Sequence, residues 1–229
     1  MLFKMVITAT ACAVIAHGGE PAAIDDGSVL FFDTLAKTRV RATPIKAKNF
    51  VELEVLWMLE KAAAPKFQPS TPISNGLYRG VTRIGNTTFT RTLLASKREN
   101  AVFIHCLVNK PGELSLRVSI AGQDSTVRIE DRRQLILSPQ PEAPAGLAAH
   151  VWVLPFESDV ASRDSSIEVR GEGEALIILR FSEQNATDRS LADTLLKLGE
   201  TYDAGHFPPD PSKIWRGVLE AHAAPVDKP

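Results

Sequence analysis

The chain has 229 residues and a formal net charge of −1, with 44% hydrophobic and 23% charged residues. These values are close to those of an average globular protein and exclude disordered, collagen-like and coiled-coil chains. A balanced charge argues against a dedicated nucleic-acid binder, which normally carries a basic excess, and against a polybasic membrane-surface protein. A chain of this length can bury a sizeable core without disulfides or metals.

The first residues have the layout of a secretory signal peptide. A short basic start precedes the apolar run Met5–Ala16, and small residues surround a candidate cleavage site near Gly18. The run is too short to span a bilayer. We therefore predict that residues 1–18 are a signal peptide, that the mature protein is secreted or periplasmic, and that it is not inserted in a membrane. A buried N-terminal element, or a lipoprotein signal at Cys12, is the alternative.

Residues 19–75 are predicted to hold N-terminal strands and a Pro-rich connection. The segment Val51–Trp57 alternates apolar and polar residues, which is typical of a half-buried strand, and helix-favouring residues follow it. We expect this strand to run into a helical turn. Residues 64–75 contain three prolines and are expected to separate the N-terminal portion from the main sheet.

Short apolar or alternating runs recur throughout residues 76–182, which we predict to be the core of a β-sandwich. Strands at such short, regular spacing, separated by turns that contain Gly, Pro and Asp, favour antiparallel pairing. The expected strands are 87–94, 101–108, 114–120, 125–130, 134–137, 150–154, 167–170 and 175–181.

The hydrophobic period changes to that of a helix in residues 183–222, so we predict a C-terminal helical extension. The first helix has leucines three and four positions apart and is expected to stop at Gly199, and the second begins at the cap Asp210 followed by Pro211. Residues 223–229 are expected to form a tail. The predicted fold class is mainly β: an antiparallel, super-sandwich-like β-sandwich with two short C-terminal helices.

No motif for catalysis, metal binding or cofactor binding is found in the sequence. No two histidines lie three or four positions apart, as a local metal clamp would need. Cys106 and His105 are neighbours in a predicted strand, so their side chains point to opposite faces and do not form a nucleophile–base pair. We therefore predict no catalytic residue, no metal site and no cofactor.

Two kinds of side chain in the sequence could bind or hydrolyse a sugar. A pair of carboxylates about 5–9.5 Å apart can cleave a glycosidic bond, but the neighbouring acids in the sequence are expected to lie on solvated surface. They are Asp25 with Asp26, Glu52 with Glu54, and Glu172 with Glu174. A tryptophan can stack on a sugar ring. Core packing is the more frequent role for Trp57, Trp152 and Trp215, and Trp152 is the candidate for carbohydrate binding.

Consecutive strand and turn motifs link Tyr78-Arg79 to three segments, Thr87–Ser96, Glu99–Leu107 and Lys110–Ile120. This stretch resembles the N-terminal β-sandwich of family 95 glycoside hydrolases, the α-L-fucosidase and α-galactosidase group, and of related family 65-type domains. The later strand pair 167–179 is similar to one in the same domain. In that family a helical barrel with the catalytic carboxylates would follow, so the resemblance implies an accessory sandwich without its catalytic domain.

The sequence therefore leaves three hypotheses for the function. The first is a secreted accessory sandwich that is not catalytic on its own and is either carbohydrate-binding or a truncated hydrolase, with a glycan or a catalytic partner chain as its partner. The second is an active carbohydrate-processing hydrolase that uses carboxylates on the sheet or a catalytic partner chain. The third is a structural or adhesion sandwich.

Overall fold

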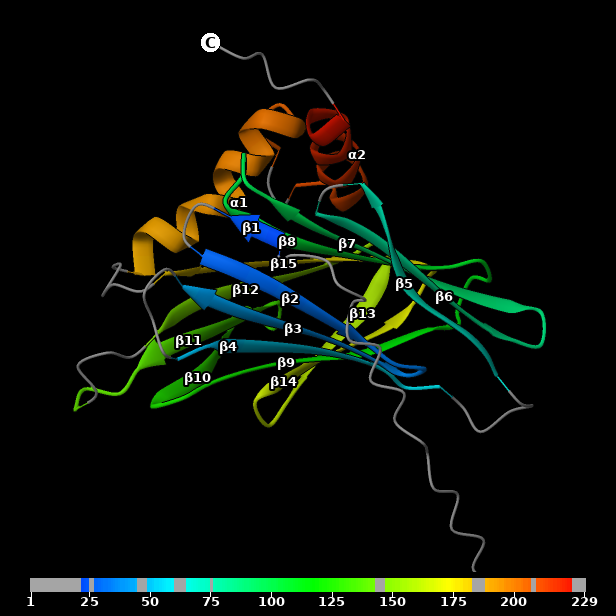
Figure 1. Cartoon of the computed structure of the whole chain (residues 1–229), viewed down its shortest axis with the longest axis horizontal. Helices are drawn as coiled ribbons and strands as arrows, with labels where there is room; N and C mark the ends of the chain where they lie inside the picture. Colours follow the sequence, from blue (N-terminus) through cyan, green and yellow to red (C-terminus); the bar gives the residue numbers. More distant parts are fainter. Residues whose placement is uncertain are drawn as a thin grey trace, which may run out of the picture.

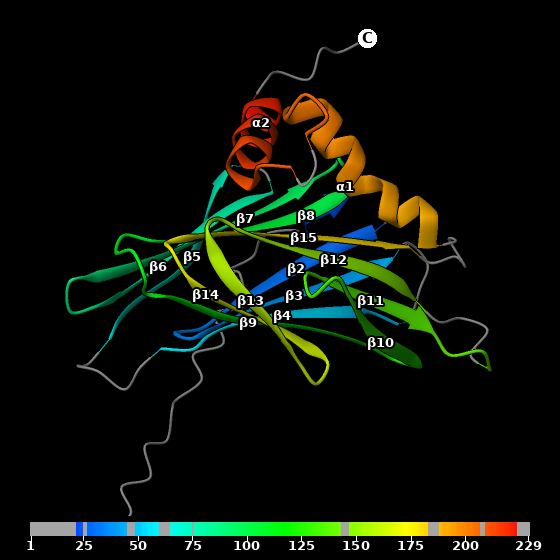
Figure 2. The same cartoon turned by 180° about the vertical axis from the view of Figure 1, so that it is seen from behind.

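The structure is a computed structural model that describes residues 22–24, 27–44, 49–59, 65–74, 76–142, 147–182, 188–206 and 209–223. Two antiparallel sheets pack face to face, and two helices lie on the outer face of one of them (Figures 1 and 2). The predicted mainly β sandwich with two C-terminal helices is confirmed. The predicted signal peptide lies outside the described residues.

The first sheet has seven strands in the order β1-β2-β3-β4-β9-β14-β13. The N-terminal strands belong to the same sandwich as the rest, because β4 pairs with β9 over the whole length of β4. The strands are β1 (Ala22–Ile24), β2 (Gly27–Asp33), β3 (Lys37–Pro44), β4 (Val51–Trp57), β9 (Leu114–Gly122), β14 (Ser166–Gly171) and β13 (Ser158–Arg163).

The second sheet has eight strands in the order β10-β11-β12-β15-β8-β7-β6-β5. All its neighbouring strands are antiparallel. The strands are β10 (Ser125–Glu130), β11 (Gln134–Pro139), β12 (Ala148–Pro155), β15 (Glu174–Ser182), β8 (Ala101–Val108), β7 (Thr87–Ser96), β6 (Leu77–Ile84) and β5 (Lys66–Ser74).

Strand β5 lies in the segment that was predicted to be a Pro-rich connection. It is the edge strand of the eight-stranded sheet, and its pairing with β6 shifts register after Gln68 and again after Pro72. An edge position tolerates proline because the missing N–H would otherwise face solvent or a bulge. The prolines therefore mark a sheet edge here, where the sequence alone suggested a connection.

Two hydrophobic layers hold the fold together. The inner faces of both sheets form the main core, to which alternate residues such as Val51, Leu53 and Val55 contribute. A second layer lies between the eight-stranded sheet and the helices and includes Phe103 and Trp215. Strand β8 is buried on both faces by these two layers, which explains why its sequence is a continuous apolar run.

The helices are α1 (Asp188–Tyr202) and α2 (Pro211–Ala223). Asp210 caps α2 as predicted, because its Oδ1 accepts the backbone N–H of Ser212 at 2.8 Å. Helix α1 does not stop at Gly199. It continues to Tyr202 and is closed by Gly205, whose φ of 78° suits the left-handed turn and whose N–H donates to the Gly199 carbonyl.

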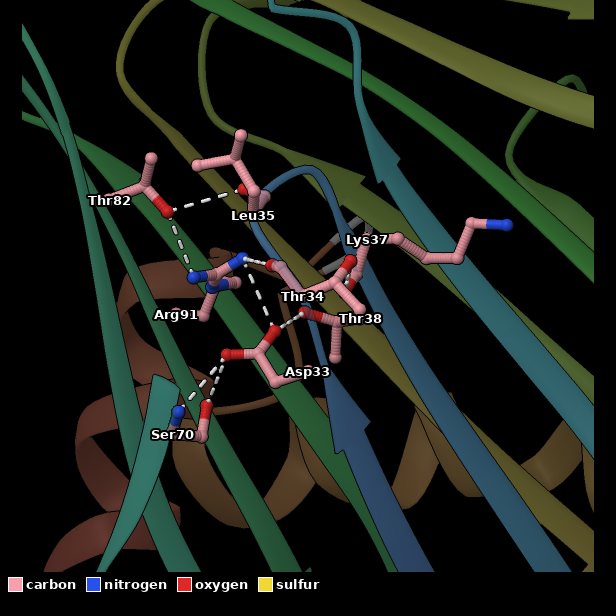
Figure 3. A network of polar contacts seen from close by, with 8 residues as sticks. All are labelled: Asp33, Thr34, Leu35, Lys37, Thr38, Ser70, Thr82 and Arg91. Atoms are coloured by element: carbon pink, nitrogen blue, oxygen red, sulfur yellow. Dashed lines mark hydrogen bonds and ion pairs between the residues drawn. The ribbon is translucent and has the colours of Figure 1, made fainter. Parts of the chain in front are cut away.

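A buried ion pair joins the two sheets (Figure 3). The side chains of Asp33 at the end of β2 and Arg91 on β7 are 4% and 0% exposed, and Arg91 Nη1 lies 3.2 Å from Asp33 Oδ1. Asp33 also accepts hydrogen bonds from Thr38 at 2.8 Å and from the Ser70 hydroxyl at 2.8 Å. Thr82 accepts a hydrogen bond from Arg91 Nη2 at 3.0 Å. The network therefore links β2, β3, β5, β6 and β7.

Burial acts on both partners of this ion pair. It raises the pKa of Asp33, while Arg91 and the hydrogen bonds oppose that rise. It lowers the pKa of Arg91, with Asp33 opposing the change. Every polar atom of Asp33 has a partner, so the charge is tolerated in the core only because the whole network is present.

Candidate functional site

A cleft of about 570 Å³ opens at one end of the sandwich, between the two sheets. This size falls within the range of small-molecule sites in proteins. We call it the end cleft. Its walls come from four separate parts of the chain: Met58 and Leu59 after β4; Ile84, Thr87 and Phe89 at the β6–β7 hairpin; Gly112, Glu113, Leu114 and Ser115 at the start of β9; and Arg170 near the end of β14.

Local contacts fix the walls of the end cleft. The backbone N–H of Met58 donates to the Ser115 carbonyl at 2.9 Å, which extends the β4–β9 pairing to the cleft. Phe89 is packed edge-on against Trp57 with ring centroids 5.4 Å apart, so the opposite wall rests on the main core. Gly112 has a φ of 80°, a value that glycine adopts without strain, and turns the chain from β8 into β9.

Charged groups lie at the rim of the end cleft. Glu113 is paired with Lys110 at 2.8 Å, and both side chains are exposed. Arg170 lies 3.6 Å from Glu168, whose Oε1 accepts a hydrogen bond from Arg117 Nη2 at 2.6 Å. The hydrogen bond from Arg117 lowers the pKa of Glu168 and keeps it ionised.

The end cleft thus combines an apolar floor with a polar rim. The floor offers aliphatic side chains and Phe89, and the rim offers a carboxylate, a guanidinium and hydroxyls. A pyranose has the matching surfaces, because its C–H face is apolar and its edge carries hydroxyls that both donate and accept. Within the described ranges, no group of three or more His, Cys, Asp or Glu side chains could hold a metal ion.

The tryptophans considered for sugar stacking do not line the end cleft. Trp152 is 2% exposed and lies beneath the helices, stacked on His150 with ring centroids 4.0 Å apart. Trp215 packs in the same layer, and Trp57 lies in the main core. In this position the Trp152 ring has no free face on which a sugar could stack, and it acts as a packing residue between sheet and helices.

The neighbouring carboxylates Glu52 and Glu54 lie on the outer face of the seven-stranded sheet. They face a row of cations on β3, with Arg41 Nη2 3.1 Å from Glu52 and Lys37 Nζ 2.8 Å from Glu54. Arg39 contacts both carboxylates. These acids form a cross-strand ion-pair ladder on a sheet face and do not line the end cleft. Asp25 and Asp26 lie outside the described residues.

Glu172 and Glu174 are separated by the turn between β14 and β15. Glu174 is part of the helix layer: its Oε1 lies 2.9 Å from His105 Nε2 and accepts a hydrogen bond from the Ser212 hydroxyl at 3.2 Å. The imidazole of His105 stacks on Trp215. The carboxylate stands between the serine and the histidine, so the histidine cannot take the serine proton and the three side chains do not form a nucleophilic triad.

Cys106 and His105 point to opposite faces of β8, as the strand geometry predicts. Cys106 is fully buried between the sheets, where burial raises the pKa of its thiol to about 12. A thiol with this pKa stays protonated at neutral pH and is a poor nucleophile. Cys106 is therefore a packing residue of the main core.

The hydrogen bond from His105 has a consequence for stability at acid pH. It lowers the folded-state pKa of Glu174 below its unfolded value of about 4.3. Ionised Glu174 therefore stabilises the fold above the unfolded pKa, and this contribution is lost as the pH falls through the folded pKa. We expect Glu174→Gln to flatten the loss of stability on acidification below roughly pH 5.

Urea unfolding midpoints measured at successive pH values test this expectation. Glu130→Gln is the control, because Glu130 is an exposed acid on β10 that is paired with Arg128. It should leave the pH profile of the wild type unchanged. An unaltered profile for Glu174→Gln would show that the contact with His105 contributes nothing to acid sensitivity.

Sequence reasoning did not find the end cleft. Its lining residues are ordinary strand-end and turn residues that lie far apart in the chain, from Met58 to Arg170. The one local signal is the turn before β9, where Pro111 and Gly112 mark a loop at a sandwich end. A turn does not indicate which other segments face it.

The chain is similar to known proteins in structure but not in sequence. No known protein family matches the sequence, and no curated protein does. A crystal structure of a bacterial glucoamylase complexed with acarbose matches with a TM-score of 0.44 and 11% sequence identity. The alignment covers 91% of this chain and 40% of the glucoamylase chain. Neither described helix is long and apolar enough to cross a bilayer.

Proposed function

We propose that this protein is a secreted or periplasmic carbohydrate-binding sandwich that has no hydrolytic activity on its own and holds a saccharide in the end cleft. The observation that carries the proposal is the end cleft itself, with its apolar floor and its rim of hydroxyl, carboxylate and guanidinium groups. The resemblance to the N-terminal sandwich of fucosidases and galactosidases supports fucose or galactose as the sugar to test first.

The positions of the acidic side chains support a binding role over a catalytic one. A glycosidase needs two carboxylates that face each other across the bound sugar. Among the described residues, Glu113 is the one acid that lines the end cleft, and Lys110 neutralises it. A single, neutralised carboxylate can accept hydrogen bonds from sugar hydroxyls but cannot supply both an acid and a base.

Filling the end cleft should abolish saccharide binding. Thr87 lines the cleft and is half-buried on the same face of β7 as Phe89, so Thr87→Trp places an indole where the sugar would lie. We expect the affinity for oligosaccharides ending in L-fucose or D-galactose to fall by about tenfold or more, which corresponds to about 1.4 kcal/mol. Isothermal titration calorimetry or affinity electrophoresis measures this change.

Thr88→Trp is the matched control. Thr88 is also half-buried and lies on the same strand, but it points to the opposite face and does not line the end cleft. This variant should bind like the wild type. Equal binding by both variants would show that the end cleft is not the site. Absence of binding by the wild type would refute the carbohydrate-binding function, and release of sugar from an aryl glycoside by the pure protein would refute the non-catalytic role.

A further inference from the structure

The side chain of Arg170 places a positive charge at the rim of the end cleft. It projects from β14 and is 67% exposed. The described carboxylate that lies within 4 Å of it is Glu168, at 3.6 Å, which is longer than a hydrogen bond. The planar fork of this guanidinium therefore has no bidentate partner among the described residues.

The acidic side chains near Arg170 either pair with other residues or lie more than 4 Å from Arg170. Arg117 holds Glu168 through two donors, at 2.6 Å and 3.1 Å. Lys110 holds Glu113 on the facing turn. Asp159 is opposite Arg170 in the β13–β14 register and Glu172 follows in the next turn, but neither pairs with Arg170 within 4 Å. Arg170 is thus an ion-pairing group that faces solvent at the mouth of a cleft.

We infer that the end cleft binds an acidic saccharide, whose uronic acid carboxylate pairs with Arg170; this inference rests on the proposed function. Arginine matches a carboxylate through two parallel N–H···O bonds, which is a geometry that lysine cannot provide. A small free acid would leave most of a 570 Å³ cleft empty. A sugar ring that bears a carboxylate fills the apolar floor and meets the guanidinium at the rim.

A comparison of matched sugars tests this inference. A galacturonic-acid-ended oligosaccharide differs from the galactose-ended one in carrying a carboxylate in place of the terminal hydroxymethyl group. Calorimetric titration of the full chain should give about twofold to fivefold tighter binding of the acidic sugar, because an ion pair at an exposed rim contributes up to about 1 kcal/mol. The preference should shrink as salt is added, because the pair lies at an exposed rim. A galactose-ended oligosaccharide 6-sulfated on its terminal residue is the third ligand and separates carboxylate recognition from general anion attraction.

Arg170→Met should remove the preference for the acidic sugar and leave the affinity for the neutral sugar nearly unchanged, and Arg170→Lys should restore only part of the preference. Arg128→Met is the control, because Arg128 is a half-exposed arginine on β10 that does not line the end cleft. Equal affinity for acidic and neutral sugars, a preference that survives Arg170→Met, or equally tight binding of the sulfated sugar would overturn the inference and leave the proposed function standing. If no sugar binds at all, the proposed function fails instead.

Discussion

Replacing Arg91 by methionine is expected to lower the free energy of unfolding by about 3–5 kcal/mol, the usual result of removing one partner from a buried ion pair. Arg91 is fully buried, and its guanidinium contacts Asp33, the Thr34 carbonyl and the Thr82 hydroxyl. Methionine fills a similar volume but leaves the Asp33 carboxylate in the core with hydrogen bonds and no counter-charge. The loss of stability is large because the Asp33 carboxylate stays buried and desolvated, while the positive charge that offset this desolvation has been removed.

Urea unfolding followed by circular dichroism measures this loss. Arg83→Met on the exposed side of β6 is the control and should change stability by less than about 0.5 kcal/mol. The double variant Asp33→Asn with Arg91→Met removes the unpaired charge and should recover part of the stability that Arg91→Met loses. If Arg91→Met proves as stable as the wild type, the network does not hold the two sheets together.

The period of two along its strand puts Arg91 on the same face as its apolar neighbours, although Arg91 was not singled out from the sequence. In Thr87–Leu94 the side chains of Phe89, Arg91 and Leu93 share one face, and the structure buries all three. A charge in the middle of an apolar face indicates a buried partner. The sequence does not say which partner, because Asp33 lies 58 positions away and meets Arg91 only when the two sheets pack.

The strands of the sandwich could be predicted from the sequence, but the apolar layer between the eight-stranded sheet and the helices could not. Alternation is a local property and defines strands such as Val51–Trp57 residue by residue. Which sheet face a helix covers is a property of the whole fold. The continuous apolar run Ala101–Val108 fits the burial of β8 on both faces, but it does not indicate that α1 and α2 cover the outer side of β8. The end cleft depends in the same way on strand ends that meet only in the folded chain.

Replacing Trp152 by alanine should cost about 3–5 kcal/mol of stability, as for other buried aromatic residues. Trp152 is a buried tryptophan in the layer between the eight-stranded sheet and the helices, together with Phe103 and Ile178 from the sheet and Trp215 from α2. Its removal opens a cavity that the sheet cannot close, because β12 is fixed by its pairing with β11 and β15. Trp152→Phe keeps an aromatic ring in this layer and should cost less.

The same pair of variants decides whether Trp152 packs the fold or binds a sugar. Urea unfolding should show a much lower midpoint for Trp152→Ala than for Trp152→Phe. At temperatures where both variants remain folded, both should bind saccharides with wild-type affinity, because the ring does not line the end cleft. A Trp152→Ala variant of wild-type stability that no longer binds saccharide would reverse this assignment. The ligand would then reach the Trp152 ring only after the helices had moved away from it, and the end cleft would not be the saccharide-binding site.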